Sequence, residues 1–166
     1  MRNTLKITTP TDLEIVMTRA FNAPRKLVWE AMTRPERIKR WLFLPPGWEM
    51  AACEDDVRVG GRFRWAWNGP DGKPGMAMNG VYREVVPLQR MVRTETLEFG
   101  CVMPGGAEQI ASVELTDTPG GNTLLTLRVK YPSKQARDAA LASGMEHGVA
   151  TGYDQLEEQL LAGATN

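Results

Sequence analysis

The pattern of apolar and polar positions divides the chain into strands and helices. Over residues 12–19 apolar side chains recur at every second position, which is the period of a half-buried β-strand. Over residues 25–33 they recur at helical spacing and predict a short amphipathic helix. A second short helix is predicted over residues 35–42, and the Pro-Pro-Gly run at 45–47 ends it. The chain therefore opens with a strand and two short helices.

From Trp48 onward the period changes to two, which predicts a run of antiparallel strands. Gly60-Gly61 predicts a turn or bulge, because paired glycines permit positive φ. Hairpin loops are predicted at 68–74 and 117–122, where glycine, proline and asparagine gather. The predicted strands cover residues 49–56, 62–67, 76–86, 90–97, 109–116 and 123–131.

The last segment predicts one long helix, which begins after Ser133 as its N-cap and ends at about Leu161. Gly144, Gly148 and Gly152 lie four residues apart along it. A glycine inside a helix costs about 1 kcal/mol relative to alanine, so three of them need a structural reason. Two interpretations are open: close packing of the helix on the sheet, or a void that no side chain from this helix face fills.

The order of elements predicts one α+β domain over residues 1–166, with its core at 12–161. A long antiparallel sheet has one face that must be covered, and the C-terminal helix is the element long enough to cover it. Opposite the helix the sheet would present large apolar side chains. They are Phe63, Trp65, Met76, Met78 and Tyr82.

Composition narrows the class of protein. Of the 166 residues 42% are hydrophobic and 24% are charged, as in globular domains. Lys and Arg number 20, as do Asp and Glu, and this zero net charge disfavours nucleic-acid binding. No apolar run approaches the roughly 20 residues of a membrane span, and the N-terminus lacks a secretory segment. We therefore expect a cytoplasmic protein without membrane insertion.

Two cysteines and one histidine leave little for metal or nucleophile chemistry. They are too few for a disulfide framework or a four-ligand zinc site, and we expect neither a metal nor another cofactor. Cys53 and Cys101 are expected to be buried small hydrophobes. His147 lies on the polar side of the predicted helix and is expected to be solvated. The acidic run 54–56 is expected at a strand end, with solvated charges.

Arg93 and Glu95 share one face of a predicted strand. If that face points inward, they form a buried pair that could orient a polar group of a ligand, because an unpaired buried charge is costly. If it points outward, they are a surface pair of little energetic value. The sequence leaves both alternatives open.

Four segments resemble one family in the same order along the chain. They are residues 21–42, 56–63, 79–87 and 144–161. They are similar to the C-terminal domain-like homologues of the heat-shock chaperone ATPase activator, in the START-like (SRPBCC, helix-grip) superfamily. The resemblance implies a curved antiparallel sheet of about seven strands wrapped around a long C-terminal helix, with the two short helices closing one end. It also implies an internal cavity, since superfamily members bind lipids, hormones, polyketides or other apolar molecules.

The chain departs from this family at one position of the last helix. Relatives often have Gly-Trp there, whereas here Gly148 is followed by Val149. The smaller side chain would enlarge the cavity locally, unless Trp65 or Met78 fills the space. The expected cavity residues are Trp41, Phe63, Trp65, Trp67, Met76, Met78, Tyr82, Arg93, Glu95, Met145, Gly148, Val149 and Gly152.

Three functions follow as expectations. The leading one is a binding module, a carrier or sensor, for a small hydrophobic ligand in the internal cavity. The second is a chaperone ATPase cofactor with a role in the stress response. The third is a cyclase-like or hydrolase-like enzyme, although the chain lacks a recognisable pair of nucleophile and base and no catalytic residue is assigned. The expected partners are a small apolar molecule and, for the second function, a chaperone; the protein would be a monomer or a homodimer.

Overall fold

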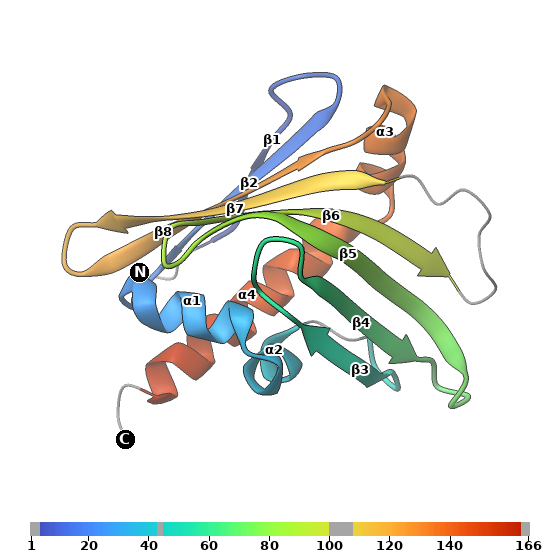
Figure 1. Cartoon of the computed structure of the whole chain (residues 1–166), viewed down its shortest axis with the longest axis horizontal. Helices are drawn as coiled ribbons and strands as arrows, with labels where there is room; N and C mark the ends of the chain where they lie inside the picture. The colour runs from blue at the N-terminus through green and yellow to red at the C-terminus, as the bar shows by residue number, and fades with distance from the viewer. Residues whose placement is uncertain (1–3, 43–44, 100–107, 164–166) are drawn as a thin grey trace.

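The computed structural model describes residues 4–42, 45–99 and 108–163 (Figure 1). The strands form one antiparallel sheet of 8 strands in the order β1-β2-β8-β7-β6-β5-β4-β3. Their bounds are β1 (Lys6–Thr8), β2 (Glu14–Phe21), β3 (Glu49–Asp55), β4 (Arg62–Asn68), β5 (Pro74–Val86), β6 (Arg90–Phe99), β7 (Gln109–Thr118) and β8 (Asn122–Lys130). The helices are α1 (Arg25–Thr33), α2 (Pro35–Trp41), α3 (Lys134–Ala142) and α4 (Met145–Gly163).

The inner face of the curved sheet and one face of α4 form the core. Alternation along β2 buries Ile15 and Met17 completely, as the sequence pattern predicts. Leu156 and Leu160 of α4 are buried at helical spacing and pack with the side chains of α1 and α2. In Figure 1, α1 and α2 lie beside the second half of α4 and cover one end of the sheet. The expected helix-grip fold is confirmed.

The C-terminal segment differs from the single long helix that the sequence predicts. Ser143 and Gly144 divide it into α3 and α4, and Gly144 has a φ of +84°. Glycine adopts this left-handed conformation without the steric cost that a Cβ brings, so the chain can change direction there. Gly144 is exposed and lies outside both helices, so it does not line a helix face.

Two other local features refine the predicted fold. The edge strand β1 precedes the strand that the sequence pattern places first. The turn at Gly60-Gly61 is confirmed and joins β5: Gly60 N–H donates to the Tyr82 carbonyl at 2.8 Å, and Tyr82 N–H donates to the Gly61 carbonyl at 2.9 Å. These bonds hold Tyr82 at the point where the pairing of β5 with β6 shifts register.

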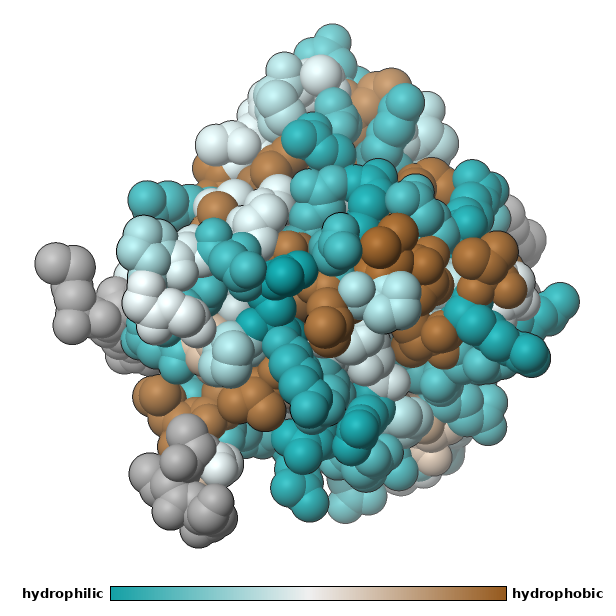
Figure 2. Space-filling view, turned by 60° about the vertical axis from the view of Figure 1, so that its left-hand side comes forward, coloured by the Kyte–Doolittle hydropathy of each residue, from teal (hydrophilic) through white to brown (hydrophobic). Residues whose placement is uncertain are grey.

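Hydrophilic residues cover most of the face drawn in Figure 2, and hydrophobic residues reach it in separate groups. The large hydrophobic side chains that are exposed in the described residues are scattered over turns and helices. They are Val59, Val86, Leu88, Leu141 and Leu161. No described helix combines the length and apolarity that crossing a membrane requires.

Candidate functional site

The inner face of β4 and β5 brings six of the expected cavity residues together. Trp65 pairs with Met78 and Trp67 pairs with Met76 in the antiparallel register, so these four side chains share one face. Phe63 and Tyr82 continue this face towards the middle of the sheet, where they are only 2% and 1% exposed. Met76 and Met78 are half-buried. The apolar face therefore becomes more accessible towards the β4–β5 hairpin.

The start of α4 shows the same change in burial. Met145, Gly148 and Val149 are half-buried, whereas Gly152 in the next turn is buried. In Figure 1 this start of α4 and the β4–β5 hairpin lie at the same end of the molecule, away from α1. Apolar residues of both layers are therefore least buried at one common end.

Trp41 lies at the other end, with the core that α1 and α2 close. It is 6% exposed, and its indole Nε1–H donates to the Ala31 carbonyl at 2.9 Å. Its ring lies against Tyr153 of α4, with centroids 5.9 Å apart. The fold thus separates Trp41 from the half-buried apolar face.

The strand face that carries Arg93 and Glu95 points inward. The two residues are 8% and 5% exposed, and Arg93 Nε lies 3.0 Å from Glu95 Oε2. The guanidinium also lies 4.8 Å from the ring centroids of Phe63 and Trp65. Burial alone would lower the pKa of Arg93, but Glu95, Tyr82 and Asp55 together outweigh this effect and raise it. Arg93 is therefore a buried cation that is already paired with Glu95.

Asp55, at the end of β3, joins this polar group. Its Oδ1 accepts a hydrogen bond of 2.5 Å from the Tyr82 hydroxyl. Burial raises the pKa of Asp55, and the Tyr82 hydroxyl and the charge of Arg93 offset part of the increase. The expectation that the acidic run is solvated holds for Glu54 and Asp56, which are exposed, and is wrong for Asp55.

The buried polar group continues across the sheet to β7. Gln109 Nε2 donates to Glu95 Oε1 at 2.9 Å, so both oxygens of Glu95 have partners. Tyr131 and Tyr153 lie close enough for the charge of Glu95 to act on them. Burial, with a smaller contribution from Glu95, raises the pKa of Tyr131 to about 12. Burial likewise raises the pKa of Tyr153.

Two indole donors on the inner face remain without an acceptor among the described residues. Trp65 Nε1 and Trp67 Nε1 are both buried and unpartnered. Trp65 faces Asp55 and lowers the pKa of that carboxyl, but it makes no hydrogen bond that satisfies its Nε1–H. Trp67 lies between Met50 and Met76 in the strand register, with apolar neighbours on both sides. A buried donor without an acceptor costs about 1 to 3 kcal/mol.

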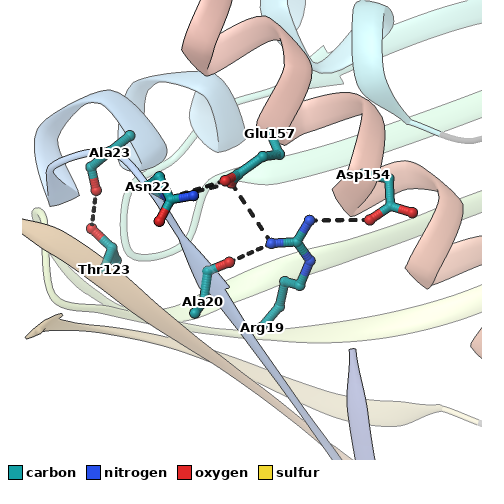
Figure 3. A network of polar contacts seen from close by, with 7 residues as sticks. All are labelled: Arg19, Ala20, Asn22, Ala23, Thr123, Asp154 and Glu157. Carbon is teal, nitrogen blue, oxygen red and sulfur yellow. Dashed lines mark hydrogen bonds and ion pairs between the residues drawn. The ribbon is translucent and has the colours of Figure 1, made fainter. Parts of the chain in front are cut away.

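A second buried network ties α4 to β2 (Figure 3). Arg19 is 2% exposed; its Nη2 lies 3.0 Å from Asp154 Oδ1, and its Nη1 lies 3.7 Å from Glu157 Oε2. Nη1 also donates to the Ala20 carbonyl. The backbone N–H of Asn22 donates to Glu157 Oε1 at 3.2 Å. These contacts hold α4 over the sheet at the closed end of the domain.

Two hollows on the surface of the described residues lie elsewhere. One, of about 420 Å³, is next to α1 and includes Arg25 and Asp117. The other, of about 400 Å³, is on the outer face of β4–β6, where Arg62 and Glu98 line it. Both are lined with ion-paired or polar side chains.

The remaining candidate groups give no catalytic or metal site in the part of the chain that the structure describes. No group of three or more His, Cys, Asp or Glu residues there could hold a metal ion. His147 is exposed, as expected. Cys53 is half-buried and burial raises the pKa of its thiol to about 11, which disfavours the reactive thiolate. Cys101 lies outside the described residues.

The profile of one family matches residues 22–160, and that family is described as "Activator of Hsp90 ATPase homolog 1-like protein". The chain belongs to this family. The structure of a protein from Rhodobacter sphaeroides is similar, with 28% identity, a TM-score of 0.85, and coverage of 95% of this chain and 98% of that one. A protein from Nitrosomonas europaea is 26% identical, with a TM-score of 0.78 and coverage of 95% and 100%. No curated protein matches the sequence.

A Mycobacterium smegmatis protein that is 21% identical, with a TM-score of 0.82 over 96% of this chain and 97% of that one, shows the shared fold alone. Like these neighbours, this member of the Activator of Hsp90 ATPase homolog 1-like family has the START-like helix-grip fold, which commonly binds hydrophobic ligands.

Sequence reasoning missed several buried polar residues of this family member. The position of Asp55 was open to prediction, because Asp55 and Cys53 occupy the same face of one strand. For Gln109, Arg19 and Glu157 the sequence carries no such signal, since their partners come from distant elements.

Proposed function

We propose that this protein binds a small, mostly apolar molecule between the inner face of β4–β5 and the start of α4. The observation that carries the proposal is that Met76 and Met78 remain half-buried on the concave side, next to Trp65 and Trp67. Large apolar side chains left partly accessible on a concave face are typical of ligand sites. The fold supports the proposal, because helix-grip proteins commonly bind hydrophobic ligands.

The buried polar group gives such a site an orienting end. Arg93, Glu95 and Tyr82 are more buried than the methionines of the same face, and Asp55 accepts a hydrogen bond from Tyr82. An apolar ligand that enters at the hairpin end would therefore place its apolar body against the methionines and its innermost atoms near these polar side chains. Ligand pockets commonly combine apolar walls with a few polar groups in this way.

Ligand binding is favoured over the chaperone ATPase cofactor function. The family match places the chain among the homologues of the activator. Membership of this family does not by itself indicate that this protein binds a chaperone. An ATPase assay with the chaperone of the same organism tests this alternative. Stimulation of the ATPase rate by the purified protein would support the chaperone cofactor function.

Binding can be measured with N-phenyl-1-naphthylamine, an uncharged probe whose fluorescence rises in apolar surroundings. We expect saturable binding to the wild-type protein and a loss of about tenfold or more in affinity for Met76→Glu, because the ligand would have to share its site with a charge. Val86→Glu is the matched control, since Val86 is on the same strand but exposed outside this face. Absence of probe binding by the folded wild-type protein would contradict the proposal.

A further inference from the structure

We propose that the ligand is electrically neutral and carries a hydrogen-bond acceptor, such as a carbonyl oxygen, that binds the indole Nε1–H of Trp67. This inference rests on the proposed binding function and adds the chemical class of the ligand. Its basis is the polarity of the inner face: among the described residues the buried indole of Trp67 lacks an acceptor and has apolar cross-strand neighbours, whereas Arg93 and Glu95 are paired with each other.

Trp67 carries one of the two buried indole donors on this face that lack an acceptor among the described residues. It is 5% exposed, and its Nε1 has no hydrogen-bond partner among the described residues. Its cross-strand neighbours, Met50 and Met76, are half-buried and provide no strong acceptor. Trp67 therefore lies next to the accessible part of the face and offers one directed polar contact in apolar surroundings. An acceptor that reaches this N–H would remove the cost of the unpaired donor.

Two other indoles of the core, those of Trp65 and Trp41, differ from that of Trp67. Trp65 faces the Asp55 carboxylate, which already provides a nearby negative partner. Trp41 donates to the Ala31 carbonyl. Trp67 is thus the indole at this face that a ligand can satisfy without competing with a protein group.

The charges of the inner face disfavour an anionic ligand. Among the described residues the cation at this face is Arg93, which is paired with Glu95 and lies against the rings of Phe63 and Trp65. Asp55 adds a second carboxylate next to the same cation. A ligand carboxylate would bring a further negative charge into low-dielectric surroundings, where the described part of the face offers only the cation already paired with Glu95. A neutral acceptor meets the Trp67 donor without that cost.

Three ligands with one aromatic frame test this inference: naphthalene, 2-acetylnaphthalene and 2-naphthoate. Each competes with N-phenyl-1-naphthylamine for the wild-type protein and for Trp67→Phe, which keeps an aromatic ring and removes the N–H. We expect Trp67→Phe to weaken 2-acetylnaphthalene about fivefold and to leave naphthalene unchanged. We expect 2-naphthoate to bind more weakly than 2-acetylnaphthalene to the wild-type protein.

Trp29→Phe is the matched control, because it removes an indole N–H from α1 instead of from the inner face. It should change none of the three affinities. Two results would overturn the neutral-acceptor inference while leaving the binding function intact, provided that the probe binds. One is an equal loss of affinity for naphthalene and 2-acetylnaphthalene in Trp67→Phe. The other is tighter binding of 2-naphthoate than of 2-acetylnaphthalene to the wild-type protein. Absence of probe binding by the folded wild-type protein would instead overturn the binding function and this inference with it.

Discussion

The guanidinium of Arg19 on β2 lies 3.0 Å from the carboxylate of Asp154 on α4, and this ion pair joins residues 135 positions apart in the chain. Arg19 is almost completely buried and also lies near Glu157, so the contact fixes the helix to the strand at the closed end.

Arg19→Met should destabilise the domain by about 3 kcal/mol or more, because it removes the buried cation that lies beside the carboxylates of Asp154 and Glu157. Urea unfolding measures the change. Arg128→Met is the matched control: Arg128 pairs with Glu14 at 2.8 Å, but its side chain is 48% exposed, so the loss should be at most about 1 kcal/mol. Equal losses in the free energy of unfolding for the two variants would show that burial of the Arg19 network does not add to its contribution to stability.

Asp55 should make the stability of the protein depend on pH. Its pKa is raised in the folded state above the ordinary value of 3.8, so the folded protein binds the proton more tightly than the unfolded chain. This contribution is complete below the ordinary pKa and is lost as the pH rises through the folded one. The free energy of unfolding of the wild type relative to Asp55→Asn should therefore fall as the pH rises above 3.8. A difference between the two proteins that is constant with pH would contradict the assignment.

The three tyrosines should resist ionisation together. Burial raises the pKa of Tyr131 to about 12 and raises those of Tyr82 and Tyr153 as well. Absorbance at 295 nm should show almost no tyrosinate in the folded protein at pH 10, whereas the urea-unfolded chain should be about half ionised there. Because the folded pKa values are higher, stability is complete below pH 10 and declines as the pH rises towards 12. Substantial tyrosinate in the folded protein at pH 10 would contradict this burial.

Gly144→Ala tests the break between α3 and α4. A Cβ at this position meets no atom within 4 Å, but the φ of +84° is unfavourable for alanine. We expect a loss of about 1 kcal/mol or more in the free energy of unfolding. Gly163→Ala, also free of contacts within 4 Å but without a positive φ, should change stability by at most about 0.5 kcal/mol. A stabilised Gly144→Ala variant would indicate that one continuous helix forms.

Gly148→Leu separates the two interpretations of the glycines in the last helix. Gly148 lies in the first turns of α4 and is half-buried beside the proposed site. If the site holds a ligand, the leucine should fill it: the melting temperature should rise, since leucine favours helix by close to 1 kcal/mol, and probe binding should fall. If the glycine serves close packing, the larger side chain should cost about 1 to 3 kcal/mol and lower the melting temperature. A lower melting temperature together with unchanged probe binding would contradict the first interpretation.

The sequence by itself determined the order of elements and the inner face of the sheet. Phe63, Trp65 and Trp67 alternate with outward residues, and side chains in a strand alternate strictly between the two faces, so their common burial was predictable. The Gly60-Gly61 turn was predictable for a similar local reason, since paired glycines permit the positive φ that Gly60 adopts.

The tertiary structure alone decided the polar interior. Periodicity shows that Arg93 and Glu95 share a face, but a face that mixes charges with apolar residues does not reveal which side the helix covers. The split between α3 and α4 depends on the backbone conformation of Gly144. The helical spacing of apolar residues continues through this position, so the sequence pattern does not reveal the break. The Arg19 network depends on where α4 packs against β2, and contacts between segments so far apart in sequence form only when the whole sheet curves around the helix.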